Sequence, residues 1–90
     1  MDKIYVYNLV TCSSSETGTH VWDVETFSSA SQAAAALRRV VSDFTKEYKN
    51  STSLEILETT DSYFSAQVSF DDGDNTILSF SAGIVMTMIQ

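Results

Sequence analysis

Apolar and β-branched residues gather in five short segments of the chain, and a sixth segment repeats its apolar residues every three to four positions. Alternation with a period of two is typical of a β-strand, and the longer period is typical of an amphipathic α-helix. The pattern therefore predicts five strands and one helix. The predicted strands cover residues 3–11, 20–27, 53–60, 63–70 and 76–89, and the predicted helix covers residues 30–49.

The helix is predicted by its N-terminal cap and by one apolar stripe. Ser29 is followed three residues later by Gln32, a capping-box spacing in which each side chain bonds the other residue's free backbone N–H. Lys46 and Lys49 suit the negative end of the helix dipole, and Asn50 is the expected stop. The predicted buried stripe contains Ala34, Leu37, Val41, Phe44 and Tyr48.

The second predicted strand alternates cleanly. Trp22 and Val24 lie on one side of it, and Asp23 and Glu25 on the other. A strand of an antiparallel sheet commonly has one buried and one solvated face, so we expect Trp22 and Val24 to be buried and the two acids to be wet.

Turn residues separate the strands. Residues 12–19 are polar and contain a glycine, which predicts a loop. Residues 71–75 carry the Asp-Gly signal of a hairpin turn. Gly83 interrupts the last strand and predicts a bulge or bend.

The order β-β-α-β-β-β predicts an α+β fold. We expect one domain, residues 1–90, built as a two-layer sandwich in which one helix covers one face of an antiparallel sheet of about five strands. One helix covers only one face. The other face of the sheet is therefore expected to be wet or to meet a partner.

Charge is distributed unevenly along the chain. The net charge is −7, yet four of the five bases lie on the predicted helix, which carries +2, so the remaining chain carries −9. An acidic sheet repels phosphate, which argues against direct binding of nucleic acid. The longest apolar run, residues 84–89, is far shorter than the roughly 20 residues of a membrane span.

Candidate catalytic chemistry is limited to Cys12, His20 and Asp23, which resemble a nucleophile, a base and an orienting acid. Their closeness across a hairpin is expected by chance, so we expect no catalytic residue and no enzyme. The single cysteine and single histidine do not suffice for a zinc site, and residues 71–75 lack the spacing of a calcium loop. We therefore expect no metal and no cofactor.

A lone cysteine and the lack of a visible signal peptide favour a cytoplasmic protein.

In its small size, its acidity and its lack of catalytic motifs, proline and disulfides, the chain resembles the anti-CRISPR and anti-restriction proteins of phages and mobile elements. The resemblance lies in the charge distribution and in the acidic segment Asp71-Asp72-Gly73-Asp74, with no shared motif. It implies a non-enzymatic inhibitor that presents acids to the basic nucleic-acid-binding groove of a nuclease complex, in the cytoplasm of a bacterial host cell.

Carboxylates two residues apart on a strand are roughly 7 Å apart along it, comparable with successive phosphates of a nucleic-acid strand. We expect Trp22 or Tyr63 to serve as an aromatic anchor if exposed. The expected partner contacts are Asp23, Glu25, Glu55, Asp71, Asp72 and Asp74.

An alternative follows from residues 84–89, which are apolar on both sides of the predicted strand. Either the strand is central and used fully by the core, or it is an exposed edge that pairs with a partner or with a second copy. In the second case the chain is an assembly module, and its acidity serves only solubility.

Overall fold

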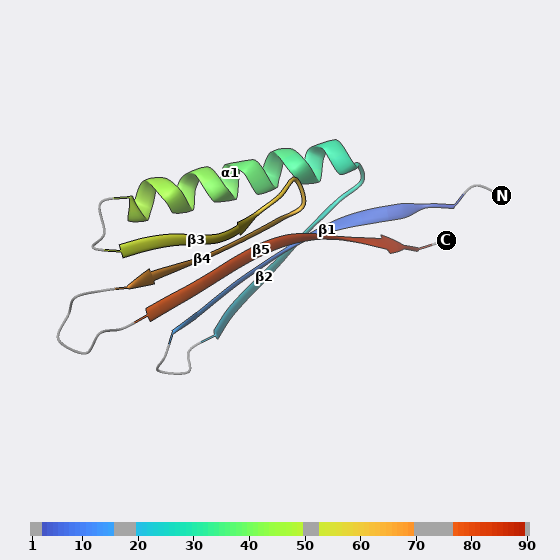
Figure 1. Cartoon of the computed structure of the whole chain (residues 1–90). Helices are drawn as coiled ribbons and strands as arrows, with labels where there is room; N and C mark the ends of the chain where they lie inside the picture. The colour runs from blue at the N-terminus through green and yellow to red at the C-terminus, as the bar shows by residue number, and fades with distance from the viewer. Residues whose placement is uncertain (1–2, 16–19, 50–52, 70–76, 90) are drawn as a thin grey trace.

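One helix lies across one face of a five-stranded antiparallel sheet (Figure 1). The computed structural model describes residues 3–15, 20–49, 53–69 and 77–89. The order of elements is the predicted one, and the α+β fold is confirmed. The elements are β1 (Tyr5–Ser15), β2 (His20–Phe27), α1 (Ala30–Tyr48), β3 (Ser53–Thr59), β4 (Tyr63–Ser69) and β5 (Ile77–Met88).

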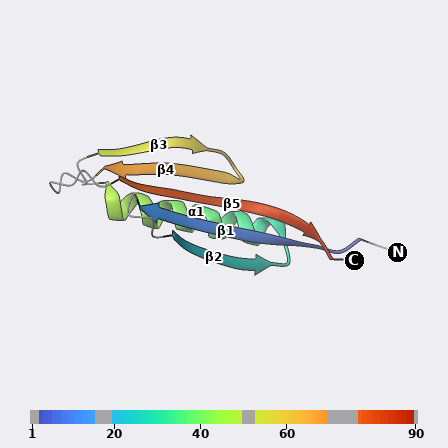
Figure 2. The same cartoon turned by 90° about the horizontal axis from the view of Figure 1, so that it is seen from below.

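The first and last strands lie side by side in the middle of the sheet. The strand order is β2-β1-β5-β4-β3, and all neighbouring strands are antiparallel. Figure 2 views the sheet from the side opposite the helix and shows this order directly. The helix connects β2 to β3, so it crosses from one edge of the sheet to the other. Consequently β2 and β3 are the two edge strands.

The core lies between the helix and the side of the sheet that faces it. Leu37 and Phe44 of the helix are buried as predicted, and Val41 and Tyr48 are partly buried. The stripe is wider than predicted, because Ala33 and Ala36 are buried alongside it. Small alanine side chains let the helix approach β1 and β2 closely. The buried residues are Leu9, Ala33, Ala36, Leu37, Phe44, Phe64, Ala66, Val68 and Ala82.

Aromatic rings fill the thicker end of this core. Phe44 stacks on Phe80 of β5 with ring centroids 4.3 Å apart. Phe64 of β4 meets Phe44 edge-on at 6.0 Å, and Tyr48 lies 4.8 Å from the same ring. Such offset and edge-to-face pairs are favourable beyond the area they bury. Phe44 is therefore the residue that ties the helix to both β4 and β5.

The helix begins as its sequence indicates. Ser29 has an extended backbone, and its Oγ accepts a hydrogen bond of 3.2 Å from the N–H of Gln32. The Gln32 side chain bonds the hydroxyl of Ser28 at 3.3 Å, so the reciprocal half of the capping box is replaced by a different contact. Lys46 lies in the last turn, and Lys49 is the C-terminal cap. The predicted stop, Asn50, lies outside the described residues.

One expectation about local structure is wrong, and a second is wrong as far as it predicted a bulge. The serines of residues 12–15 belong to β1, which pairs there with both β2 and β5, because flanking strands on each side outweigh the weak strand propensity of serine. Gly83 forms no bulge, since its pairing with β1 continues in register. The irregularity lies instead in β3, between Ile56 and Glu58.

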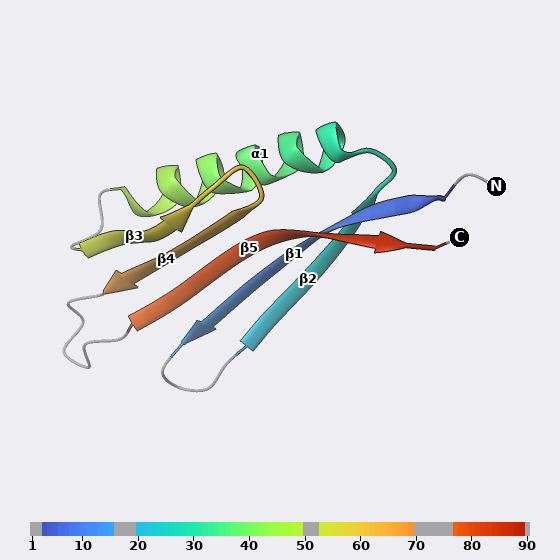
Figure 3. The same ribbon diagram turned by 45° about the vertical axis from the view of Figure 1, so that its right-hand side comes forward.

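The molecule is long and thin, with extents of 59 × 24 × 16 Å. Its 19-residue helix spans about 28 Å, whereas the 12 residues of β5 span about 40 Å. The far end of β5 therefore continues beyond the helix together with the start of β1, as Figure 3 shows. No described helix is long and apolar enough to cross a membrane.

Candidate binding surface on the uncovered sheet face

The side of the sheet that faces away from the helix is the open face. Successive side chains of a strand point to opposite sides, so the buried Leu9, Phe64 and Ala82 identify which residues face the helix. Their neighbours in sequence lie on the open face. Its main members are Val10, Cys12 and Ser14 of β1, Trp22 and Val24 of β2, Ser79, Ser81, Gly83 and Val85 of β5, Tyr63, Ser65 and Gln67 of β4, and Glu55 and Glu58 of β3.

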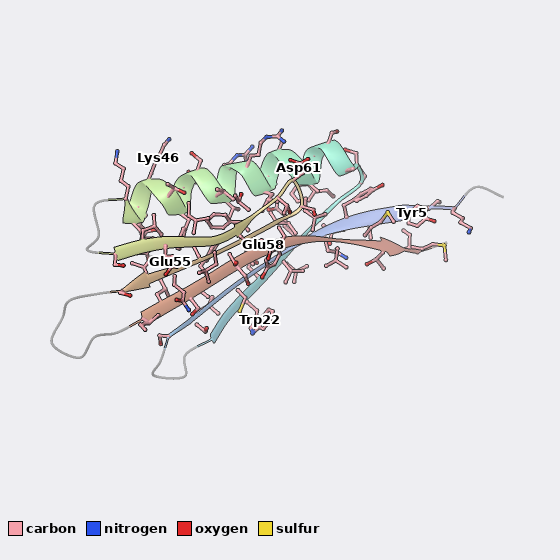
Figure 4. The ribbon with its side chains drawn as sticks, in the orientation of Figure 1. Tyr5, Trp22, Lys46, Glu55, Glu58 and Asp61 are labelled. Carbon is pink, nitrogen blue, oxygen red and sulfur yellow. The ribbon has the colours of Figure 1, made fainter. Side chains whose placement is uncertain are left out.

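Trp22 stands on the open face at the β2 edge, and Figure 4 shows it on the side of the sheet opposite Lys46 of the helix. It is 66% exposed, and its neighbour on the same face, Val24, is 58% exposed. The alternation predicted for this strand is confirmed, but the expected burial of Trp22 and Val24 is wrong. The reason is the register, because the pairing with Cys12 and Val10 places Trp22 and Val24 on the side of the sheet away from the helix, where no described element covers them.

Small residues form the floor beside Trp22. Directly opposite it in β1 is Cys12, followed across the sheet by Ser81 of β5 and Ser65 of β4. These side chains are too short to shield the indole ring. The row ends at Glu58 on the β3 edge.

The next row is built around Gly83. It runs from Val24 through Val10 and Gly83 to Tyr63. A Cβ atom placed on Gly83 would lie 3.0 Å from Cδ1 of Tyr63, so the ring lies against the space that the missing side chain leaves. Glycine at this position therefore sets the position of the tyrosine ring.

Two shallow hollows follow from this arrangement of small and large side chains. One, of about 300 Å³, lies over the serines and is bounded by Leu57 of the β3 bulge. The other, of about 280 Å³, lies between Trp22 and Val85. Cys12, Tyr63 and Ser81 line both hollows, so the two form one continuous depression along the open face.

A hydrogen-bonded ladder ties three strands together at one end of the open face. The Thr26 hydroxyl donates to Oδ1 of Asn8 at 2.7 Å, and Nδ2 of Asn8 donates to the hydroxyl of Thr87 at 3.2 Å. Cross-strand polar pairs of this kind fix the register between strands. These hydrogen bonds account for the three polar side chains at this position, so no ligand is needed to explain their presence.

The predicted acidic contacts do not form one surface. Asp23 and Glu25 lie opposite Thr11 and Leu9 of β1, which places both acids on the helix side of the sheet. Glu25 there lines a hollow with Arg39 of the helix. Asp23 and Glu25 therefore share no face with Glu55, since β2 carries its acids on the helix side and β3 carries Glu55 on the open face.

Glu55 lies where it was expected, on the open face, and Glu58 joins it there (Figure 4). None of the described strands contains a lysine or an arginine. The open face is therefore neutral and partly apolar, with a negative β3 edge. The predicted contacts Asp71, Asp72 and Asp74 lie outside the described residues, and their role stays a prediction.

The three residues considered for catalysis do not assemble into a triad. Cys12 is half-buried on the open face, and the strand register places Ser14, not Cys12, opposite His20. Asp23 lies on the helix side of the sheet, opposite Thr11, whereas Cys12 lies on the open face. Among the described residues, no three histidine, cysteine or acidic side chains are grouped closely enough to hold a metal ion.

Sequence reasoning missed the small-residue floor. Its members were assigned to a loop or to the solvated side of a strand. A signal was present, because serine or cysteine recurs at every second position in Cys12–Ser14 and in Ser79–Ser81. Comparison of the chain with protein families, with curated proteins and with solved structures found no match.

Proposed function

We propose that the protein is a non-enzymatic binding protein that docks its open face onto a partner protein with a basic surface. The observation that carries this proposal is the exposure of Trp22 and Tyr63 on opposite sides of a depression lined by small residues. Tryptophan and tyrosine are the residue types that most often dominate the energy of protein interfaces. When a partner covers this exposed indole ring, its apolar surface is removed from water, and that burial contributes favourably to the free energy of binding.

The charges on the two layers favour a basic partner. Glu55 and Glu58 lie on the open face, and no described strand carries a lysine or an arginine. On the helix side the four bases of the helix are offset by acids, namely Asp43, Glu47, Asp23 and Glu25. The open face is therefore the more negative of the two sides and the one that attracts a positive partner. We infer that the partner belongs to the class the sequence suggested, a nucleic-acid-handling protein whose basic groove the chain occupies and so inhibits.

The open face is large enough for such a complex. The molecule measures 59 × 24 Å in its two long directions, which bounds the open face at roughly 1,400 Å², and a standard protein interface buries about 800 Å² on each partner. An interface of standard size therefore fits within the outline of the molecule. Across the face, Trp22 on the β2 edge and Tyr63 on β4 supply the aromatic contacts, and Glu58 supplies an acidic contact on the β3 edge.

The experiment is a capture from bacterial lysate with the tagged wild-type chain and three variants. Trp22→Ala and Tyr63→Ala each remove one aromatic ring from the open face, and Arg38→Ala changes only the helix layer. We expect a nucleic-acid-binding protein to be retained by the wild type and by Arg38→Ala and to be lost with both aromatic variants. The captured protein is then purified, and its nuclease activity is measured with increasing amounts of the chain.

Equal retention of that protein by all four baits would contradict the assignment of the open face. Retention without any effect on nuclease activity would contradict inhibition while leaving the interface in place. A further arm reverses the charges of Asp71, Asp72 and Asp74. Weaker binding by this variant would support the contribution of that acidic segment, and unchanged binding would remove it from the site.

A further inference from the structure

The last part of β5 has a partner strand on only one side. Pairing with β4 ends at Gly83, opposite Tyr63, whereas pairing with β1 continues to Met88, opposite Tyr5. Figures 1 and 2 show β1 and β5 continuing together beyond the end of the helix. Among the described residues, this two-stranded extension leaves one edge of β5 without a partner strand along residues 85–89.

The direction of each backbone group on this edge can be assigned from two hydrogen bonds. The N–H of Ile84 donates to the carbonyl of Ser62, on the β4 side, at 2.9 Å. The N–H of Ile89 donates to the carbonyl of Ile4, on the β1 side, at 2.8 Å. Backbone groups alternate in direction along a strand. Met86 and Met88 therefore direct their N–H and C=O groups away from β1, where no described strand pairs with them.

The side chains of this edge are apolar on both faces of the extension. Val85, Met86, Met88 and Ile89 are each 54–59% exposed. Met86 and Met88 lie on the helix side, beyond the end of the helix, and Val85 lies on the open face. No charged residue interrupts the segment from Ile84 to Ile89. An edge that is apolar on both faces and open along its backbone is a template for strand pairing.

The other two edges of the described sheet are protected. Strand β2 carries Asp23 and Glu25, and strand β3 carries Glu55, Glu58 and a bulge. Charges and bulges are the usual devices that prevent pairing between sheet edges. The end of β5 lacks both. The opposite edge of the same extension, Tyr5–Val6 of β1, also lacks them, because β2 pairs with β1 only from Tyr7 onward, but it is shorter and follows Lys3.

We propose that a second copy of the chain binds here, with its own β5 antiparallel to the first. An antiparallel pair of identical strands is self-complementary about a twofold axis. Because Met86 and Met88 supply the outward backbone groups, the matching register places Met86 of one copy opposite Met88 of the other. Each such pair exchanges two hydrogen bonds. Thr87 then faces the partner's Thr87 at the axis, a favourable cross-strand pair, and the methionines of both copies form one cluster on the helix side.

The lack of charge in this segment favours a second copy over a charged partner. Two copies of a chain with a net charge of −7 repel each other wherever their acids meet. At the β5 edge, the described residues bring no acids together. The twofold axis is perpendicular to the joined sheet, so both open faces lie on the same side. If the proposed function holds, the dimer therefore presents two partner-binding surfaces in parallel and gains avidity.

The test uses purified protein alone, so its outcome is independent of the partner proposed above. Sedimentation velocity over a wide range of concentration is expected to show a reversible monomer–dimer equilibrium. Met88→Pro removes an N–H that the β1–β5 ladder does not use, and it eliminates half of the intermolecular hydrogen bonds. We expect this variant to stay monomeric while its circular dichroism spectrum remains that of the wild type and its melting matches that of the wild type at a dilution where the wild type is monomeric.

Val24→Pro is the matched control. Val24 lies opposite Val10, and by the same alternation it directs its N–H outward from the β2 edge. The Val24→Pro variant therefore has a proline at a different edge of the sheet, and it should dimerise like the wild type. A wild type that is monomeric at every concentration, or a dimer that persists in Met88→Pro, would overturn the proposal.

The register is tested by one engineered cysteine. Thr87→Cys in a Cys12→Ser background places two thiols at the axis, where opposed Cα atoms are about 4.5 Å apart, within the range of a disulfide. We expect rapid oxidation to a covalent dimer. Thr26→Cys in the same background is also exposed but lies away from this edge, and it should cross-link no faster than random collision allows. Equal rates for the two variants would refute the register.

Discussion

Trp22 and Phe44 are large aromatic residues whose removal should have very different effects on folding. Trp22 is 66% exposed, so about a third of its surface is covered by the protein. Full burial of a large apolar side chain contributes about 3 kcal/mol, so Trp22→Ala should lower the free energy of unfolding by about 1 kcal/mol. Phe44 is 6% exposed and contacts three other rings. Phe44→Ala should cost about 3–5 kcal/mol.

The assay is urea unfolding followed by far-ultraviolet circular dichroism, which does not depend on the indole. A domain of this length has about 5–13 kcal/mol of stability in total, so the two variants should be clearly separated. Trp22 is the only tryptophan of the chain. Its fluorescence should therefore show the red-shifted emission of a solvated indole and be quenched readily by iodide.

A Trp22→Ala variant as unstable as Phe44→Ala would refute this reasoning. The indole would then belong to the core, as the alternation of β2 first suggested, and the open face would lose its anchor. Poor quenching by iodide in dilute protein would lead to the same conclusion. Both measurements are made below the concentration at which copies associate, because a dimer could also shield the ring.

Three further outcomes follow from single contacts. Gly83→Ala should displace the Tyr63 ring, seen as shifted ring resonances by nuclear magnetic resonance, while changing stability by less than about 1 kcal/mol, since the gain over glycine in a strand offsets the close contact of 3.0 Å. Ser29→Ala should cost about 1 kcal/mol in urea unfolding, because it removes the acceptor for the Gln32 N–H, whereas Ser42→Ala at an exposed helix position should cost little. Burial, followed by the charge and hydrogen bond of Glu47, raises the pKa of Tyr48 above its usual 10.0, so the folded state holds this proton more tightly than the unfolded state. Stability should therefore fall as the pH rises above about 10, and Tyr48→Phe should remove that part of the loss in an alkaline titration.

The elements of the fold could be predicted because each is encoded locally. The helix depends on the Ser29 cap and on a stripe that repeats within the segment itself. The alternation in β4, with Phe64, Ala66 and Val68 buried, likewise needs only neighbouring residues. These signals do not depend on where an element lies in the sheet, so they were sufficient for the element order and the fold class.

The binding surface could not be predicted because it depends on the register between strands. The alternation of Trp22 with Glu25 is the same whichever face of the strand meets the helix. Only the pairing of Cys12 with Trp22 and of Leu9 with Glu25 shows that Trp22 lies on the open face and Glu25 on the helix side. Ser13 and Ser14 lie in a strand for a related reason, since the strands on both sides hold them in a conformation that their own propensity does not favour.

Salt dependence separates the two proposed interactions. Docking of the open face onto a basic partner uses attraction between Glu58, Glu55 and positive charges, so its affinity should fall as ionic strength rises. Pairing of two β5 edges brings together uncharged segments of two chains that each carry −7, so screening should strengthen it. The two affinities, measured in the same buffers by titration of the partner and by sedimentation of the chain alone, should therefore change in opposite directions. A dimer that weakens with salt would mean that charged residues hold it together, and the β5 edge would not be its interface.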